Sequence, residues 1–273
     1  MTALPRITIL TPSLNQARFL EKAILSVLEQ GYPHLEYVVM DGGSTDGSVD
    51  IIRRYADRLT YWQSQPDGGQ SAAINAGFAR SSGEIMGWLN SDDRLAPGAL
   101  QTVAAFFNAH PDSDWCAGTG TVVDARGRQL GDTIPAGLDF ETLAQWFDHF
   151  ICQPSVFWRR SLWDRVGPLD ERLHLAMDLD LWLRFARSGH GGVLPATLAF
   201  ALDHSGAKSR RLQPDSFVET CLVLERHGAH EQAKARLLRV VRRAYEVDAL
   251  LRPITRNPLY RRWRDKREGK APG

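Results

Sequence analysis

The sequence predicts an α/β protein with a Rossmann-like, mostly parallel sheet flanked by helices and a C-terminal helical extension. Two observations carry this prediction. Over residues 1–118, short apolar runs alternate with helical patterns, as in repeated strand–helix–strand units. Beyond about residue 210, the pattern is helical only. At roughly 150 residues per domain, 273 residues fit one large domain, residues 1–210, with an extension of residues 211–273.

The first half is expected to contain five strands separated by four helices. The strands are predicted at Ile7–Leu10, Glu36–Met40, Leu59–Gln63, Glu84–Trp88 and Asp114–Ala117. The helices are predicted at Ala17–Glu29, Ser48–Tyr55, Ala72–Arg80 and Gly98–Ala109. The first helix has an apolar stripe at helical period and ends where Gly31 and Pro33 follow. Buried strands between amphipathic helices predict three layers.

After Gly118 the alternation stops, and we expect the sheet to end near a hairpin whose turn is the sequence DARG. The remaining elements are expected to be a helix at Phe140–Phe150, a strand at Pro154–Trp158, a helix at Met177–Arg187, a strand at Gly192–Asp203, and helices from Pro214 onward, including Ala233–Leu251. The proline-interrupted segment that starts at Arg252 is expected to be irregular.

Composition excludes several classes of protein. With 43% hydrophobic and 24% charged residues, the chain is not of the disordered type. No apolar run approaches the roughly 18 residues of a membrane-spanning helix, and no signal peptide is recognisable, so a cytoplasmic location is expected. Cys116, Cys152 and Cys221 lie far apart in no metal-binding spacing, and we expect them to be reduced.

The net charge of +1 conceals an acidic body and a basic tail. Residues 234–270 hold 13 Lys and Arg against 4 Asp and Glu, which leaves 20 against 28 elsewhere. The tail is expected to contact an anionic membrane surface peripherally, at the inner face of the membrane. Alternatively, it packs on the body or on a second copy in a homodimer. Nucleic acid is not expected as a partner, because the tail carries no recognised motif and the body is acidic.

Small, polar and acidic residues follow the first four predicted strands. Because open α/β sheets bind ligands at the carboxyl ends of their strands, these loops predict a single site. They are Thr11–Asn15, Asp41–Gly47, Gln65–Gln70 and Asn90–Asp93.

Two of these loops suggest specific chemistry. Asp41 ends a strand before glycines that let a ligand approach the backbone, and is placed to accept hydrogen bonds from a base or ribose; Asp46 is instead expected to cap a helix. Asp92 and Asp93 offer the carboxylate oxygens that Mg²⁺ and Mn²⁺ prefer, completed by substrate phosphates. The alternative for this pair is a simple turn.

Further candidates lie in the second half. Asp178 and Asp180 interrupt an apolar helix start. A carboxylate in a partly apolar cleft can have a raised pKa and act as a general base. We assign that role to Asp178, and expect an ion pair of Asp180 with Arg184 four residues on. His204 and Lys208 follow the last predicted strand in a loop with Gly206, and could close over a diphosphate.

Three strings taken together resemble the inverting family 2 glycosyltransferases of the GT-A fold. They are ITILTPSLNQARFLEKAILSVLEQGYPHLEYVVMDGGSTDGSVDII, DGGQSAAINAGFARSSGEIMGWLNSDD and AMDLDLWLRFARSG, between Ile7 and Gly189. The resemblance implies transfer of a sugar, of hexosyltransferase type, from a nucleotide-sugar donor to a saccharide or lipid-linked acceptor, as in polysaccharide biosynthesis. It also implies a nucleotide-binding half at about 1–118, an acceptor half at about 119–210, and Mn²⁺ or Mg²⁺ as cofactor.

The resemblance also implies roles for individual residues. The donor, most simply a UDP-sugar, would be bound by a set that shares the carboxyl edge of the sheet: Thr11, Pro12, Asn15, Asp41, Asp67, Asn75, Asn90, Ser91, Asp92 and Lys208. Asn90, Ser91 and Asp92 stand in place of the family's Asp-x-Asp metal motif, with Asn as the first residue. Metal ligation is implied for Asp92, Asp93 and His204. Asp178 stands in the family's Glu-Asp pair as catalytic base, Met177 replaces the Glu, and Gln153 and Met177 would meet the acceptor.

Two other classes of protein remain open on the sequence. A non-catalytic nucleotide-sugar-binding protein could use the same fold, although it has no need of a carboxylate at Asp178. A sugar-phosphate nucleotidylyltransferase would want a glycine-rich basic loop after the first strand, where this chain has TPSLNQAR.

Overall fold

The computed structural model describes residues 4–255, apart from the side chains of residues 209 and 244–255, and has the predicted mixed α/β fold. Its sheet has the strand order β3-β2-β1-β4-β8-β6-β9-β5, and β7 pairs with β6. The strands are β1 Ile7–Ser13, β2 Leu35–Asp41, β3 Tyr61–Ser64, β4 Ile85–Trp88, β5 Arg94–Leu95, β6 Trp115–Asp124, β7 Gln129–Thr133, β8 Val156–Arg159 and β9 Gly191–Asp203.

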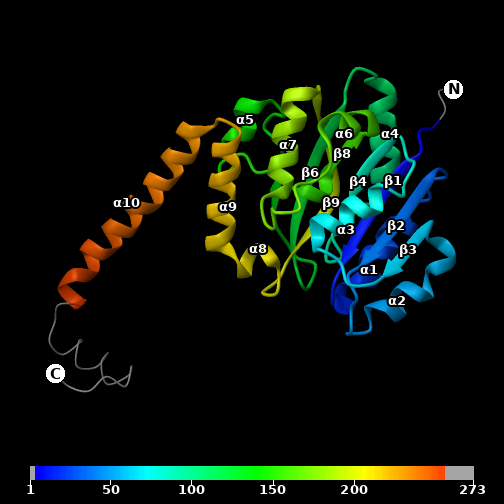
Figure 1. Cartoon of the computed structure of the whole chain (residues 1–273), viewed down its shortest axis with the longest axis horizontal. Helices are drawn as coiled ribbons and strands as arrows, with labels where there is room; N and C mark the ends of the chain where they lie inside the picture. The colour runs from blue at the N-terminus through cyan, green and yellow to red at the C-terminus, as the bar shows by residue number, and fades with distance from the viewer. Residues whose placement is uncertain (1–3, 256–273) are drawn as a thin grey trace. The chain divides into compact units, whose positions relative to one another are not determined.

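The first half follows the prediction closely. Strands β3, β2, β1 and β4 are parallel neighbours, with α3 packed beside them (Figure 1). The connecting helices are α1 Ala17–Leu28, α2 Ser48–Arg54, α3 Gln70–Phe78 and α4 Ala99–Ala109, and a short 3₁₀ turn, η1, covers Ala56–Arg58. Ser13 pairs with Asp41, which pairs with Ser64. The carboxyl ends of three strands therefore meet in register at one edge of the sheet, where the polar loops begin.

The expectation that the sheet ends near Gly118 is wrong. Strand β6 continues to Asp124 and pairs with β7, β8 and β9, so the second half extends the same sheet. Strand β8 lies antiparallel between β4 and β6, and β9 is parallel to β6. Alternation of strands and helices identifies parallel units only, and therefore gives no signal for an inserted antiparallel strand of four residues.

Several boundaries in the second half differ from the prediction. The helix expected at Phe140–Phe150 is only α5, Phe140–Ala144, whose N-terminus is capped by Asp139. The strand expected from Pro154 begins at Val156, after the 3₁₀ turn η2, Gln153–Ser155. Helices α6 Arg160–Val166 and α8 Lys208–Arg211 were not expected, whereas α7 Met177–Ser188 was.

The two faces of the sheet carry different cores. On the face of α1, α2 and α4, aliphatic side chains such as Ile9, Leu20 and Ile24 are completely or almost completely buried. The other face carries tryptophans: Trp88 lies 5.5 Å from Trp182 in a stacked arrangement and 5.5 Å from Trp158 in an edge-on one, between ring centroids. Rigid aromatic packing of this kind fixes the strands and helices that hold the loops at the carboxyl edge.

The chain divides into two compact units, residues 1–223 and 224–273. Helix α9, Gln213–Arg226, crosses the division, and α10, His230–Thr255, belongs to the second unit. Because α10 runs through Thr255, the segment from Arg252 is helical at its start rather than irregular, and the rest of the basic tail lies outside the described residues. No helix within residues 4–255 is both long and apolar enough to cross a membrane.

Gly120 on β6 offers a test of this packing. A Cβ at position 120 would overlap Cys152 and lie 3.0 Å from Ser155 Oγ, in the segment that carries η2. We expect Gly120→Ala to lower the free energy of unfolding by about 1–3 kcal/mol, because overpacking forces that segment off the strand. Urea unfolding measures the change. Gly131→Ala on β7, where a Cβ meets nothing within 4 Å, is the control, and equal stability of both variants would contradict this packing.

Candidate active site

The loops that follow β1 and β2 are bound to each other. Asn15, in the left-handed conformation with φ of 54°, accepts a hydrogen bond at Oδ1 from the backbone N–H of Thr45 (2.9 Å) and donates its own N–H to Ser44 Oγ (2.7 Å). Asp46 accepts hydrogen bonds from the N–H groups of Ala17 and Ser48, at 2.9 and 3.0 Å. The N-cap residue of α2 is Gly47 rather than Asp46, but Asp46 satisfies the first N–H group of α2 and that of α1.

Asp41 is nearly inaccessible, with 1% of its surface exposed. Its carboxylate accepts hydrogen bonds from the N–H groups of Gly43 and Ser44 and from the hydroxyls of Ser44 and Ser64, at 2.6 to 3.1 Å. The Asp41 carboxylate thus holds the loop Asp41–Gly47 in place through these hydrogen bonds. Its predicted contact with a base or ribose stays a prediction.

The third loop lies against the second. A Cβ on Gly42 would lie 3.0 Å from Asp67 Oδ2, so glycine lets the two loops approach closely without displacing the Asp67 carboxyl. Asp67 accepts a hydrogen bond from the N–H of Gly69 (2.8 Å). Thr11 and Pro12 are buried in β1, where the Thr11 hydroxyl hydrogen-bonds to Tyr37. The loops after β1, β2 and β3 therefore lie together at the carboxyl edge of the sheet, as the sequence predicts.

Asn90 connects the fourth loop to two other segments. Its Oδ1 accepts from Gln70 Nε2 (2.8 Å), and its Nδ2 donates to Gln153 Oε1 (3.1 Å) and to Asp93 Oδ2 (3.3 Å). Gln153 in turn donates to the carbonyl oxygen of Trp88 (2.8 Å). An aspartate at position 90 could make none of these donations and would face the carboxyl of Asp93. Asn90, which stands where the family's motif has its first aspartate, therefore makes two hydrogen-bond donations that an aspartate could not make.

The two neighbouring acids have different environments. Asp93 is buried, accepts a hydrogen bond from the N–H of Leu202 (3.0 Å), and has a pKa raised by burial and by the charge of Asp92. Asp92 is partly exposed and lies 3.1 Å from His204 Nε2, and the imidazole ring packs on Phe19 with centroids 4.6 Å apart. Ser91, between Asn90 and Asp92, is buried.

A divalent cation fits this arrangement only with help from a substrate. Among the side chains that the structure describes, no group of three or more His, Cys, Asp or Glu that could hold a metal ion is assembled. Asp92 and His204 are an oxygen and a nitrogen ligand side by side, and Mg²⁺ is typically bound by one or two carboxylates together with substrate phosphates and water. Both oxygens of Asp93 are engaged in hydrogen bonds, so its predicted ligation stays a prediction.

Asp178 lies in the first turn of α7 and is partly exposed. Burial among apolar groups is the main cause that raises its pKa to about 6, opposed by the N–H of Leu179 and reinforced by the charge of Glu219. Asp180 is buried and forms the expected ion pair with Arg184, at 3.0 Å. The two acids of this turn thus differ as predicted: one is paired, and the other keeps access to solvent.

Glu219 on α9 binds the backbone of the three residues that precede α7. Its Oε1 accepts hydrogen bonds from the N–H groups of His174, Leu175 and Ala176, at 2.6 to 2.9 Å. A carboxylate at a helix N-terminus is stabilised by the helix dipole, and it fixes the turn on which Asp178 sits. The sequence contains no signal for this contact, which spans more than 40 residues.

The Asp178 turn and the Asp93 turn are linked through neighbouring residues of α3, because Gln70 donates to Asn90 and Ser71 to Met177, each at 2.8 Å. Burial raises the pKa of the Cys152 thiol, and the carboxyl groups of Asp93 and Asp178 both raise it further. Both acids therefore lie within electrostatic reach of one sulfur atom. Met177, next to Asp178, accepts a hydrogen bond at sulfur from Ser71 Oγ (2.8 Å) and is buried.

Asn75 and Lys208 make contacts beyond those expected. The Asn75 amide accepts from the N–H of Leu169 (2.9 Å) and donates to the Leu169 carbonyl and to Glu171, so it ties α3 to the loop before α7. Lys208 Nζ donates to Gln70 Oε1 (3.4 Å), which connects the segment after His204 to the end of the third loop. Their contacts with a donor stay predictions.

The fold and its loops at the carboxyl edge of the sheet are those of a ligand-binding α/β protein, and comparison with known proteins identifies the family. The chain belongs to glycosyl transferase family 2, whose model matches residues 8–164. An uncharacterized glycosyltransferase of Mycobacterium tuberculosis is 32% identical over 191 residues, covering 68% of this chain and 71% of that one. A PGL/p-HBAD biosynthesis glycosyltransferase of Mycobacterium bovis is 31% identical, covering 67% and 70%.

Solved structures show the same fold. TarS of S. aureus, residues 1–349 in complex with UDP-GlcNAc, superposes with a TM-score of 0.65 at 19% identity, covering 80% of this chain and 65% of that one. The mannosyltransferase PcManGT of Pyrobaculum calidifontis, in complex with GDP-Man and Mn²⁺, gives a TM-score of 0.60 at 19% identity, covering 96% and 84%. The GT-A fold predicted from the sequence is confirmed.

Glu219→Gln tests the electrostatic link to Asp178. The amide oxygen of Gln can still accept the three hydrogen bonds, while the negative charge that raises the pKa of Asp178 is removed. We expect the pKa of Asp178 to fall below its value of about 6, as followed by carboxyl ¹³C NMR titration. Glu29→Gln, at an exposed position after α1, should leave it unchanged. An unchanged pKa in Glu219→Gln would contradict the link.

Proposed function

We propose that this protein transfers a sugar, with inversion, from a nucleotide-sugar donor to a hydroxyl group of a saccharide or lipid-linked acceptor. The observation that carries the proposal is Asp178: a partly exposed residue whose carboxyl has a raised pKa, on a turn that α3 links to the turn of Asp92 and Asp93. A carboxyl with a pKa of about 6 is ionised at neutral pH and retains basicity, as a general base requires.

In the proposed reaction, the Asp178 carboxylate takes the proton of the acceptor hydroxyl. The acceptor oxygen forms a bond to the anomeric carbon from the face opposite the diphosphate. The bond between that carbon and the diphosphate oxygen breaks, and the diphosphate leaves with the electron pair. Attack from the opposite face inverts the configuration. Below its pKa Asp178 is protonated and cannot accept the proton, so the rate should fall as the pH drops through about 6.

The leaving diphosphate needs positive charge. A bound Mn²⁺ or Mg²⁺ supplies electrostatic stabilisation to such a leaving group. We propose that Asp92 and His204 hold the cation, because their side chains are adjacent and Asp92 is partly exposed. Lys208, whose ammonium lies over Gln70, would add a second positive charge from the same loop.

The proposed chemical classes of donor and acceptor are based on similarity to known proteins. TarS is in complex with UDP-GlcNAc and PcManGT with GDP-Man, which supports a nucleotide-sugar donor. We propose UDP as its nucleotide, as in the complex of TarS. Thr11, Pro12, Asn15, Asp41 and Asp67 would then surround the nucleoside, and Gln153 and Met177 would border the acceptor. The PGL/p-HBAD biosynthesis relative supports a glycan or glycolipid product.

We also propose a cytoplasmic location with peripheral membrane contact through the basic tail. The support is the excess of 13 Lys and Arg over 4 Asp and Glu in residues 234–270, which matches an anionic lipid surface. Association into a homodimer stays a prediction.

Asp178→Asn separates catalysis from binding. We expect the transfer rate to drop about 10²- to 10⁴-fold, because the general base is lost, while donor affinity measured by calorimetry stays within about twofold, since Asn keeps the size of the side chain. Asp164→Asn, at an exposed position on α6, should retain full activity. Wild-type turnover by Asp178→Asn would favour the alternative of a non-catalytic nucleotide-sugar-binding protein in which this carboxylate has no role.

Asp92→Asn tests the cation. In isothermal titration with UDP and Mn²⁺, we expect affinity to fall about tenfold or more, since a charged ligand to the cation is replaced by a neutral one. Without Mn²⁺, Asp92→Asn and wild type should bind UDP with nearly the same affinity. Asp57→Asn on η1 is the charge-matched control, and equal Mn²⁺-dependent binding by Asp92→Asn and wild type would rule out the metal role.

A further inference from the structure

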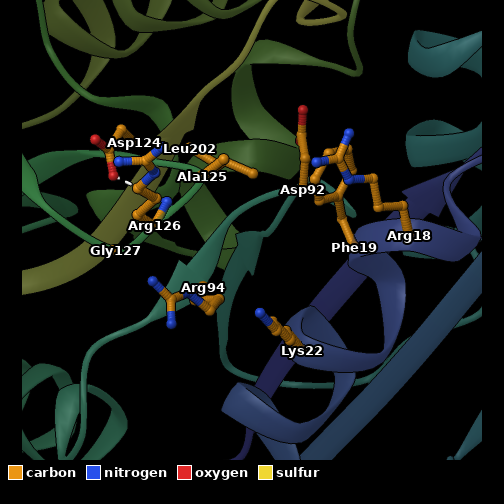
Figure 2. A pocket seen from close by; sticks show the side chains of 10 residues that line it. All are labelled: Arg18, Phe19, Lys22, Asp92, Arg94, Asp124, Ala125, Arg126, Gly127 and Leu202. Atoms are coloured by element: carbon orange, nitrogen blue, oxygen red, sulfur yellow. Dashed lines mark hydrogen bonds between the residues drawn. The ribbon is translucent and has the colours of Figure 1, made fainter.

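A cavity of about 330 Å³ opens on the α1 side of Asp92. It lies between the first turns of α1, strand β5, the turn that joins β6 to β7, and the end of β9 (Figure 2). Among the residues predicted to bind donor, acceptor or metal, Asp92 is the one that lines it. Asp178, Gln153 and the loops after β2 and β3 take no part in its wall.

Four basic side chains line this cavity. Arg18 and Lys22 are four residues apart on α1 and therefore share one helix face, Arg94 comes from β5, and Arg126 from the turn. Figure 2 shows Lys22 and Arg94 extending toward the space between α1 and the turn. We call these four side chains the basic pocket.

The four positive charges of the basic pocket exceed the negative charges of Asp92 and Asp124 in the same lining. Among the described residues, none of the four side chains forms an ion pair with a carboxylate. The two acids of the lining are occupied elsewhere: Asp124 binds Arg128 (3.2 Å) and the N–H groups of its own turn, and Asp92 binds His204. Four cations around one cavity repel each other, and a bound anion would relieve that repulsion.

Two of the guanidinium groups are held in place without losing their donors. Arg18 lies over the ring of Phe19, at 5.2 Å from its centroid, and Arg94 over Phe200, at 5.6 Å. Stacking on an aromatic face restrains the guanidinium and leaves the N–H groups at its edge available. Those N–H groups match phosphate oxygens in paired, charge-assisted hydrogen bonds.

We propose that the basic pocket binds a phosphate or diphosphate group carried by a molecule other than the nucleotide-sugar donor. The group is identified by charge, since four cations suit a multiply charged anion better than a single carboxylate. A separate molecule is indicated because the pocket shares only Asp92 with the predicted donor set. The same group can come from a soluble phosphorylated compound or from a lipid headgroup.

Titration of the full chain with pyrophosphate, without divalent cations, tests the proposal. We expect wild type to bind, and Arg94→Gln/Arg126→Gln to bind about tenfold or more weakly, as loss of charge-assisted contacts implies. Lys22→Gln should show a smaller loss. Arg53→Gln/Arg58→Gln, near the far end of α1, removes the same charge and should match wild type. Equal urea midpoints would show that all variants fold.

Three results would overturn the proposal. Wild type could fail to bind pyrophosphate, or the pocket variants could bind it as well as wild type does. Alternatively, Arg94→Gln/Arg126→Gln could lose affinity for UDP with Mn²⁺ as strongly as for pyrophosphate, which would make the pocket part of the donor site. None of these measurements requires turnover, so they stand apart from the test of Asp178.

The source of the phosphate is resolved with vesicles. Sedimentation of the same full-length variants with phosphatidylglycerol vesicles, against phosphatidylcholine vesicles, keeps the contribution of the basic tail constant. Weaker sedimentation of Arg94→Gln/Arg126→Gln with phosphatidylglycerol supports a lipid headgroup. Unchanged sedimentation together with lost pyrophosphate binding supports a soluble phosphorylated ligand.

Discussion

The amide of Asn90 is the interaction on which the arrangement of the site depends. It accepts a hydrogen bond from α3 through Gln70 and donates to η2 through Gln153, while it also donates to the buried Asp93. A carboxylate could not combine these roles, because it has no donor. Asn90 therefore forms a neutral junction of three segments, and Asp92 is the more exposed of the two acids of this turn.

Beneath this junction lies the tryptophan core. Trp88 ends β4 directly before the Asn90 turn, its carbonyl accepts the hydrogen bond of Gln153, and its ring stacks on Trp182 of α7, the helix that carries Asp178. The contact between Trp88 and Trp182 thus connects β4, the strand before the Asn90–Asp93 turn, with α7, the helix that carries Asp178. The position of the Asn90–Asp93 turn relative to Asp178 is therefore set by the packing of large, rigid side chains rather than by the loops themselves.

The sequence predicts local features well and long-range contacts poorly. Alternating strands and helices revealed the parallel half, and four-residue spacing revealed the pair of Asp180 with Arg184. The insertion of β8 between β4 and β6 was missed because its partners are distant in sequence and its pattern is short. The hydrogen bonds from Glu219 to α7 and from His204 to Asp92 join residues that only the folded chain brings together.

Arg18 and Phe19 are neighbours in the first turn of α1, and both line the cavity of the basic pocket. The ring of Phe19 supports the imidazole of His204, whereas the guanidinium of Arg18 belongs to the basic pocket. The loop that carries His204 and the wall of the basic pocket are therefore both in contact with a single helical turn, whose first N–H group donates a hydrogen bond to Asp46. A displacement of that turn would shift His204 and the basic pocket together.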